Sequence, residues 1–130
     1  MPPPTTSPDR DPTTAQLIAE RAEAVARVES RRAELEALAG VAMSEGRDDE
    51  HDPDGATVAF EQSLAAGLLA QAVAYLTEVD LALERLSAGR HGVCERCGRP
   101  IPKARLEARP TARYCVMCAT DRPVLRPGFE

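Results

Sequence analysis

The chain has 130 residues and a formal net charge of −5, with two tyrosines, two phenylalanines and no tryptophan. Its apolar content comes mainly from alanine, leucine and valine, which suits helices packed side by side and argues against a thick globular core. The length allows one modest domain, or a small domain with an extended element.

The N-terminal segment, residues 1–13, is rich in proline, threonine and aspartate. Such a segment buries too little apolar surface to offset its ordering entropy, so we expect a disordered tail. It has no apolar stretch like that of a signal peptide, and no apolar run in the chain approaches the ~20 residues of a membrane span. We therefore expect a cytoplasmic protein with no membrane partner, in which disulfides are disfavoured.

A first long helix is expected from about residue 14 to residue 45, where the chain has no proline and a single glycine, Gly40. Glutamate and arginine fill many of its positions, and both residue types favour helix. An apolar stripe recurs at helical spacing: Ile18, Val25, Val28, Leu35 and Ala42.

The second helix shows a cleaner pattern, because nine positions follow one another at alternating steps of four and three. They are Val58, Gln62, Ala65, Leu69, Ala72, Leu76, Val79, Leu83 and Leu86. An a/d seam of this kind is the signature of a coiled coil. Asp52 and Pro53 predict the start of the helix, and Gly89 predicts its end.

Two long helices joined by a short polar turn predict an antiparallel hairpin over residues 14–89, with pairing between chains as the alternative. The joint, "DDEHDPDGA" from Asp48 to Ala56, belongs to an acidic tip near residues 46–56. Like charges repel each other, and the dipole of the second helix accommodates only one or two of these carboxylates. The acidic tip is either a solvated loop or a contact surface.

Four cysteines follow in a module over residues 90–119, with the spacing C-x2-C-x17-C-x2-C: Cys94, Cys97, Cys115 and Cys118. Two such pairs complete a tetrahedral S4 site, which favours one structural Zn²⁺ and leaves no open position for catalysis. An iron tetrathiolate has the same ligands, and oxidation of a zinc site would make a redox switch. His91 is close in sequence, and we expect it to be solvated.

Seven basic residues lie between Arg90 and Arg113, opposed by Glu95 and Glu107. They are suited to phosphate or acidic surfaces. The stretch between the cysteine pairs is short and contains three prolines, so it offers no recognition helix for a major groove. We expect no direct sequence-specific DNA binding.

The segment "GVCERCGRPIPKARLEARPTARYCVMC", from Gly92 to Cys118, resembles the DksA/TraR family of bacterial transcription regulators. The shared signature is "CxxCG", an isoleucine, "RLEARPTA" and a final "CxxC", and a looser resemblance reaches back to about residue 14. The resemblance implies a zinc module at the base of a projecting helical hairpin. It also implies that the hairpin enters the secondary channel of RNA polymerase and brings acidic residues toward the catalytic centre.

By this resemblance, Asp54 and Ala56 match the second and third positions of the family's tip motif. The first position falls on His51, beside Asp52, so all four residues are candidates for the partner-binding tip. Arg105 and Arg109 are candidates for contact with the polymerase. Only Arg109 matches the family's basic site for the alarmone ppGpp, whereas Gln71 and Glu78 stand at other basic positions, so binding of the alarmone is not expected. The last segment, residues 120–130, lies outside the resemblance.

The sequence thus predicts a mainly α protein, with a coiled-coil hairpin and a four-cysteine zinc module, acting as a monomeric transcription regulator on RNA polymerase. It is not expected to be an enzyme, because no nucleophile and base share a plausible cleft. The alternative functions are a zinc-stabilised protein-interaction module and a thiol-based redox sensor, each with another partner.

Overall fold

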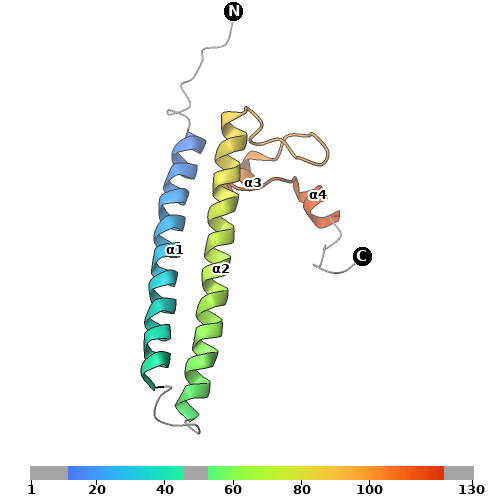
Figure 1. The fold of residues 1–130 in the computed structure, drawn as a ribbon. Coiled ribbons are helices and arrows are strands. Elements are labelled where there is room, and N and C mark those ends of the chain that lie inside the picture. Colours follow the sequence, from blue (N-terminus) through green and yellow to red (C-terminus); the bar gives the residue numbers. More distant parts are fainter. Residues whose placement is uncertain (1–11, 46–52, 122–130) are drawn as a thin grey trace, which may run out of the picture. The chain divides into compact units, whose positions relative to one another are not determined.

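The computed structural model describes residues 12–45 and 53–121 (Figure 1). It contains two long helices, α1 (Pro12–Glu45) and α2 (Pro53–Ser87), followed by two short ones, α3 (Lys103–Ala108) and α4 (Val116–Asp121). No strand occurs within these residues apart from an isolated antiparallel bridge between Val93 and Pro100. The mainly α class and the two long helices agree with the sequence analysis, and α2 begins at Pro53 as predicted.

One compact unit comprises the described residues of Glu20–Thr77, and it is an antiparallel pair formed by most of α1 and most of α2 (Figure 1). Its buried apolar residues are small, with Ala24 and Val28 from α1 and Ala65 and Ala72 from α2. The hydroxyl of Tyr75 donates a hydrogen bond of 2.6 Å to the Glu20 carboxylate across the pair. Small side chains at the seam allow two helices to approach closely, so a chain poor in aromatic residues can still form this hairpin.

The other compact unit comprises the described residues of Met1–Ala19 and Glu78–Glu130. It contains the first turns of α1, the last turns of α2, and the cysteine module with α3 and α4. Its buried side chains include Leu17 of α1, Val79 and Ala82 of α2, and Ile101 of the module. Both long helices therefore contribute buried residues to this unit as well.

The predicted seam of α2 is confirmed, because none of its nine positions is exposed. Ala65, Ala72 and Val79 are buried, and the other six are half-buried. The helix ends in a Schellman motif, in which Arg90 N donates to Arg85 O at 2.8 Å and Gly89 N donates to Leu86 O at 3.1 Å. Gly89 thus stops the helix, as the sequence predicted.

The predicted stripe of α1 is wrong at Ile18, which is 54% exposed, whereas its neighbour Leu17 is fully buried. The buried positions of this helix include Thr14, Leu17, Ala24 and Val28. Successive steps of three, seven and four fit a heptad repeat that passes through Leu17. Ile18 and Leu17 are both apolar, so composition alone did not distinguish them.

Helix α2 is apolar on more than one face, with Phe60, Leu64, Val73 and Leu81 exposed. Over Ala56–Ser87 it meets the length and composition of a membrane span, with a mean hydropathy of 1.3 in its most apolar window. The expectation that no run approaches such a span was therefore too strong. The same test is met by core helices of soluble proteins, and so it is weak evidence for a membrane location.

Candidate metal centre in the cysteine module

The first cysteine pair lies in a tight turn between the end of α2 and α3. Gly98 N donates to Cys94 O, and Cys94 N donates to Arg99 O, both at 2.9 Å. These two hydrogen bonds fold the chain back on itself, so both sulfur atoms are presented from one turn. We refer to this turn, residues 94–99, as the first knuckle.

The second cysteine pair lies where the chain enters α4. Cys115 immediately precedes this helix, and Cys118 lies within its first turn. Ala119 N donates to Cys115 O at 2.9 Å, which extends the helical hydrogen bonding back to Cys115. The residues from Tyr114 to Cys118 form the second knuckle, and its two cysteines are three positions apart, as residues on one helical face are.

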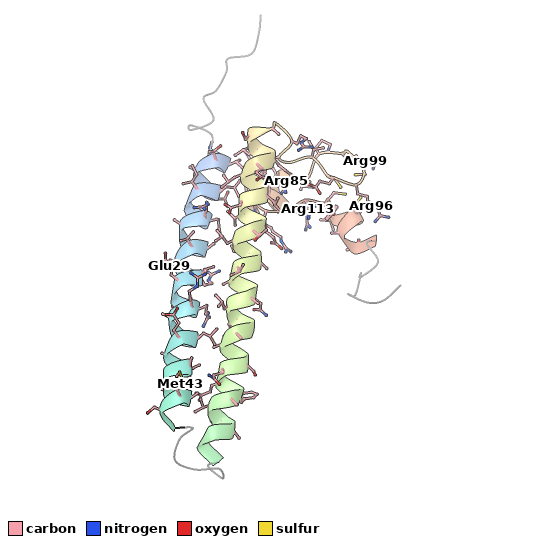
Figure 2. The ribbon with its side chains drawn as sticks, in the orientation of Figure 1. Glu29, Met43, Arg85, Arg96, Arg99 and Arg113 are labelled. Carbon is pink, nitrogen blue, oxygen red and sulfur yellow. The ribbon has the colours of Figure 1, made fainter. Side chains whose placement is uncertain are left out.

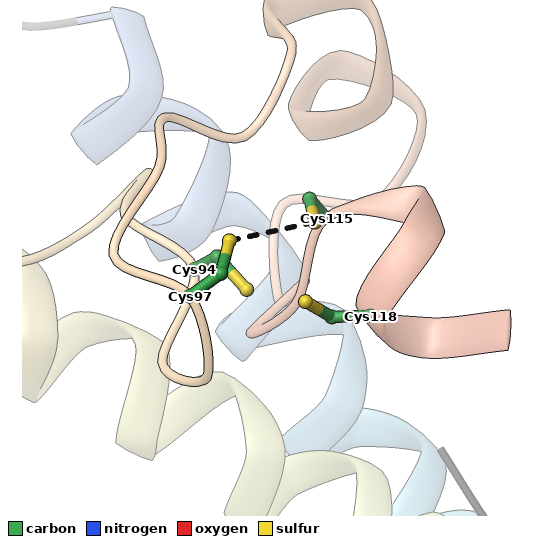
Figure 3. Close-up of side chains that lie close together, drawn as sticks. All are labelled: Cys94, Cys97, Cys115 and Cys118. Atoms are coloured by element: carbon green, nitrogen blue, oxygen red, sulfur yellow. Dashed lines mark hydrogen bonds between the residues drawn. The ribbon is translucent and has the colours of Figure 1, made fainter. Parts of the chain in front are cut away.

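The four sulfur atoms converge, all lying within 4.8 Å of one another (Figure 3). The sulfurs of Cys97 and Cys115 are 3.8 Å apart. Four thiolates bound tetrahedrally to one zinc ion at about 2.3 Å would be about 3.8 Å from one another. The cluster therefore fits a single structural zinc ion held by two cysteines from each knuckle, as the spacing of the cysteines predicted.

The thiols of the cluster differ in acidity. Burial opposes ionisation of Cys94, but hydrogen bonds from the backbone of Cys115, Cys97 and Arg96 outweigh it and lower the pKa of the thiol to about 6. Hydrogen bonding with Cys115, together with burial, raises the pKa of Cys118 to about 12. Thiolate is the form that binds metal, so Cys94 is predisposed to act as a ligand, whereas Cys118 would lose its proton only with the help of a bound cation.

Backbone and side-chain hydrogen bonds hold the module around the cluster. Ile101 N donates to Gly92 O at 2.7 Å, and the Arg105 Nε donates to Tyr114 O at 2.9 Å, just before the second knuckle. His91 was expected to be solvated, but it is half-buried and its Nε2 lies 2.8 Å from Pro110 O. A carbonyl only accepts, so this ring carries a proton on Nε2.

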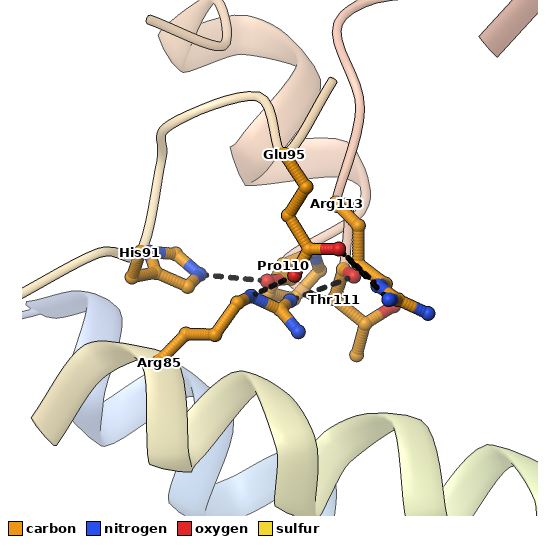
Figure 4. A network of polar contacts seen from close by, with 6 residues as sticks. All are labelled: Arg85, His91, Glu95, Pro110, Thr111 and Arg113. Atoms are coloured by element: carbon orange, nitrogen blue, oxygen red, sulfur yellow. Dashed lines mark hydrogen bonds and ion pairs between the residues drawn. The ribbon is translucent and has the colours of Figure 1, made fainter. Parts of the chain in front are cut away.

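A charged network that the sequence analysis missed joins the two halves of the module (Figure 4). Glu95 Oε2 accepts from Arg113 Nε at 2.9 Å and forms an ion pair with Arg113 Nη2 at 2.8 Å. The hydrogen bond from Arg113 lowers the pKa of Glu95, and the same bond raises the pKa of Arg113. Arg85 forms a longer ion pair with Glu95, at 3.8 Å, and burial lowers its pKa. Opposite charges near the cysteines were visible in the sequence, but their pairing was not.

The two candidate basic residues of the module differ in their surroundings. Arg105 is half-buried and already bonded to Tyr114 O, whereas Arg109 is exposed. Both line a polar hollow of about 220 Å³, together with Arg113 and Glu78. A carboxylate, Glu78, thus lies in the lining of a hollow that three arginines also line.

The candidate residues of the acidic tip are described only in part. His51 and Asp52 lie outside the described residues, and so do most of the carboxylates of this segment. Asp54 lies in the first turn of α2, with its side chain outside the description, and Ala56 is an exposed residue of the same helix. The proposed roles of these four residues stay predictions.

Comparison with known proteins gives the same family from sequence and from structure. Residues 89–123 match the family described as "Prokaryotic dksA/traR C4-type zinc finger". The structure of the transcription factor DksA2 from Pseudomonas aeruginosa is similar, with a TM-score of 0.68 and 31% identity, covering 82% of this chain and 76% of that one. The chain belongs to the DksA/TraR family. It therefore carries a C4 zinc finger with one structural zinc ion.

Two further relatives show how the similarity is distributed. An uncharacterised protein from Aquifex aeolicus is 36% identical over 106 residues, which cover 82% of this chain and 70% of that protein. The RNA polymerase-binding transcription factor DksA from Caulobacter vibrioides is 51% identical over 41 residues, which cover 32% of this chain and 29% of that factor. The Caulobacter factor, whose name states that it binds RNA polymerase, is thus more identical to this chain than the Aquifex protein is, but only over a short part of both chains.

Proposed function

We propose that this protein is a DksA/TraR-type transcription factor that binds RNA polymerase and modulates transcription initiation. The observation that carries the proposal is the similarity to DksA2 over 82% of the chain, which includes the helical hairpin as well as the zinc finger. The Caulobacter and Haemophilus influenzae relatives whose names state polymerase binding support the choice of partner. In this proposal the protein is a cytoplasmic, monomeric regulator without catalytic activity and without sequence-specific DNA contacts.

The hairpin would enter the secondary channel of the polymerase with its acidic tip first. Two antiparallel helices with a continuous seam form a stiff element, and the carboxylate-rich segment joins them. Asp54 is the principal candidate for action near the polymerase's catalytic metal, because a carboxylate attracts or repositions a divalent cation. His51, Asp52 and Ala56 would shape the contact around it.

Basic residues of the zinc finger would contact the polymerase around the channel entrance. We assign this role to Arg109, which is exposed, and a bracing role to Arg105, whose Nε is already bonded to Tyr114 O. Binding of the alarmone ppGpp beside Arg109 is not expected, since Glu78 lies in the lining of the same hollow and would repel a polyanion.

The substitution Asp54→Asn tests the role of the tip, because it removes one charge and keeps the side-chain size. We expect polymerase binding to change little, while the protein concentration needed to alter transcription rises about tenfold or more, equivalent to about 1.4 kcal/mol. The measurement is transcription in vitro with purified polymerase, with binding followed separately. Glu61→Gln is the matched control, since Glu61 is an exposed carboxylate of the same helix. Unchanged regulation by the Asp54 variant would contradict the tip mechanism.

A further inference from the structure

Glu95 of the first knuckle and Arg113, which directly precedes the second knuckle, connect the two parts of the zinc finger without using a sulfur atom. Glu95 directly follows Cys94, and Arg113 lies two residues before Cys115. Their backbones are linked, because Glu95 N donates to Arg113 O at 2.9 Å. Their side chains are linked too, with both Nε and Nη2 of Arg113 within 2.9 Å of Glu95 Oε2. The first knuckle and the residue directly before the second knuckle are therefore joined twice, once by backbone and once by side chains.

A buried arginine anchors this pair to the end of α2 (Figure 4). Arg85 is only 8% exposed, and its Nη2 donates to Thr111 O at 3.3 Å while its Nε lies 3.8 Å from Glu95 Oε1. A buried guanidinium is costly unless it is paired and hydrogen-bonded, so Arg85 favours the arrangement that supplies both partners. Arg85, Glu95 and Arg113 together form what we call the knuckle clamp.

We propose that the knuckle clamp positions the two cysteine pairs before the metal binds, so that zinc enters a cradle that is already assembled. None of its contacts involves a cysteine side chain, so none of them is made through a metal ligand atom. Small zinc fingers generally fold only with metal, and the binding free energy is then largely used for folding. In a finger that the clamp has already ordered, less of the binding free energy is needed to order the loops, and zinc therefore binds more tightly.

The exposure of the Glu95–Arg113 ion pair bears on how much zinc affinity the clamp contributes. The side chains of Arg113 and Glu95 are 44% and 32% exposed, and an isolated ion pair of this kind contributes little. The clamp is more than an isolated pair, because a backbone hydrogen bond and a buried arginine converge on it. Loss of residues that orient metal ligands typically reduces metal affinity about 10- to 100-fold.

The first test measures zinc affinity of the full chain under reducing conditions, by competition with a chromogenic chelator. We expect Glu95→Gln and Arg113→Gln each to weaken zinc binding about 10- to 100-fold. The double variant should be no weaker than the worse single variant, because the two residues act as one unit. The control is Arg99→Gln, since Arg99 lies on the same module and belongs to none of the clamp contacts (Figure 2).

The second test follows hydrogen exchange in the metal-free chain. The amide of Glu95, bonded to Arg113 O, should stay protected in the metal-free wild type and lose protection in metal-free Arg113→Gln. Far-UV circular dichroism of the same samples reports whether the long helices are intact. Wild-type affinity in both single variants would overturn the proposal. So would an unprotected Glu95 amide in the metal-free wild type, since the cradle would then depend on zinc for its assembly.

Discussion

At the scale of single residues, Gly92 shows how closely the finger is packed next to its metal site. Its φ is 84°, in the left-handed region, and its carbonyl accepts the hydrogen bond of Ile101 N. A Cβ added to Gly92 would lie 3.3 Å from Leu106 Cδ1 of α3. Both the backbone conformation and the neighbouring side chain therefore favour glycine at the position two residues before the first metal ligand.

Gly92→Ala is expected to lower the free energy of unfolding of the zinc-bound protein by about 1–2 kcal/mol, because left-handed backbone is costly for any residue with a Cβ. Chemical denaturation of the zinc-bound chain measures the change. Gly40→Ala is the control in helix α1, where an added Cβ meets nothing within 4 Å. It should stabilise the protein by up to about 1 kcal/mol through helix propensity. Equal effects of the two substitutions would contradict this account of Gly92.

At the scale of elements, the register of α1 decides which of two adjacent apolar residues supports the fold. Leu17 is fully buried and Ile18 is 54% exposed, although their hydrophobicity is similar. The face that α1 presents is set by its pairing with α2, whose own seam was clear in the sequence. An error of one residue rotates a helix by about 100° about its axis, which moves the stripe away from its partner.

Leu17→Ala should destabilise the protein by about 2–5 kcal/mol, because it leaves a cavity in a packed interior. Ile18→Ala should cost less than about 1 kcal/mol, since most of its side chain already contacts water. Urea denaturation of both variants, with zinc present throughout, measures the loss in free energy of unfolding caused by each substitution. If the larger loss came from Ile18, the register described for α1 would be wrong.

At the scale of the whole molecule, the long helix α2 contributes residues to both compact units and is apolar around much of its circumference. A seam against α1 uses only one face, so apolar side chains such as Phe60 and Leu64 remain exposed. Met43 of α1 is exposed as well (Figure 2). The uncharged stretch of α2 is bounded by Glu61 and Glu78, and Asp80 and Glu84 follow in the same helix.

We therefore expect the purified chain to stay in the aqueous fraction when mixed with vesicles of neutral and anionic phospholipids. A carboxylate such as Glu78 or Asp80 near the bilayer centre would cost about 2.5–3.5 kcal/mol, and α2 would have to leave its partner helix. Vesicle flotation measures the distribution, and a membrane-spanning helical protein serves as the positive control. Flotation of this chain with the vesicles would show that the apolar surface of α2 binds lipid.

The sequence alone determined the features that depend on short-range spacing. Steps of four and three fixed the seam of α2, Pro53 and Gly89 fixed its ends, and the paired cysteines with the "RLEARPTA" segment fixed the metal ligands and the family. These features were predictable because a helix and a tetrahedral thiolate site each impose their own spacing on the chain.

Only the tertiary structure decided the features that depend on neighbours distant in sequence. It placed Leu17 inside and Ile18 outside, bonded His91 to Pro110, and brought Arg85, Glu95 and Arg113 into one clamp. In the sequence the three clamp residues lie in a segment that contains many charged residues. Each acidic side chain there has several basic side chains nearby with which it could form an ion pair. Which charged side chains form ion pairs depends on their distance and burial in the folded chain. Their order in the sequence has no periodicity from which the partners could be identified.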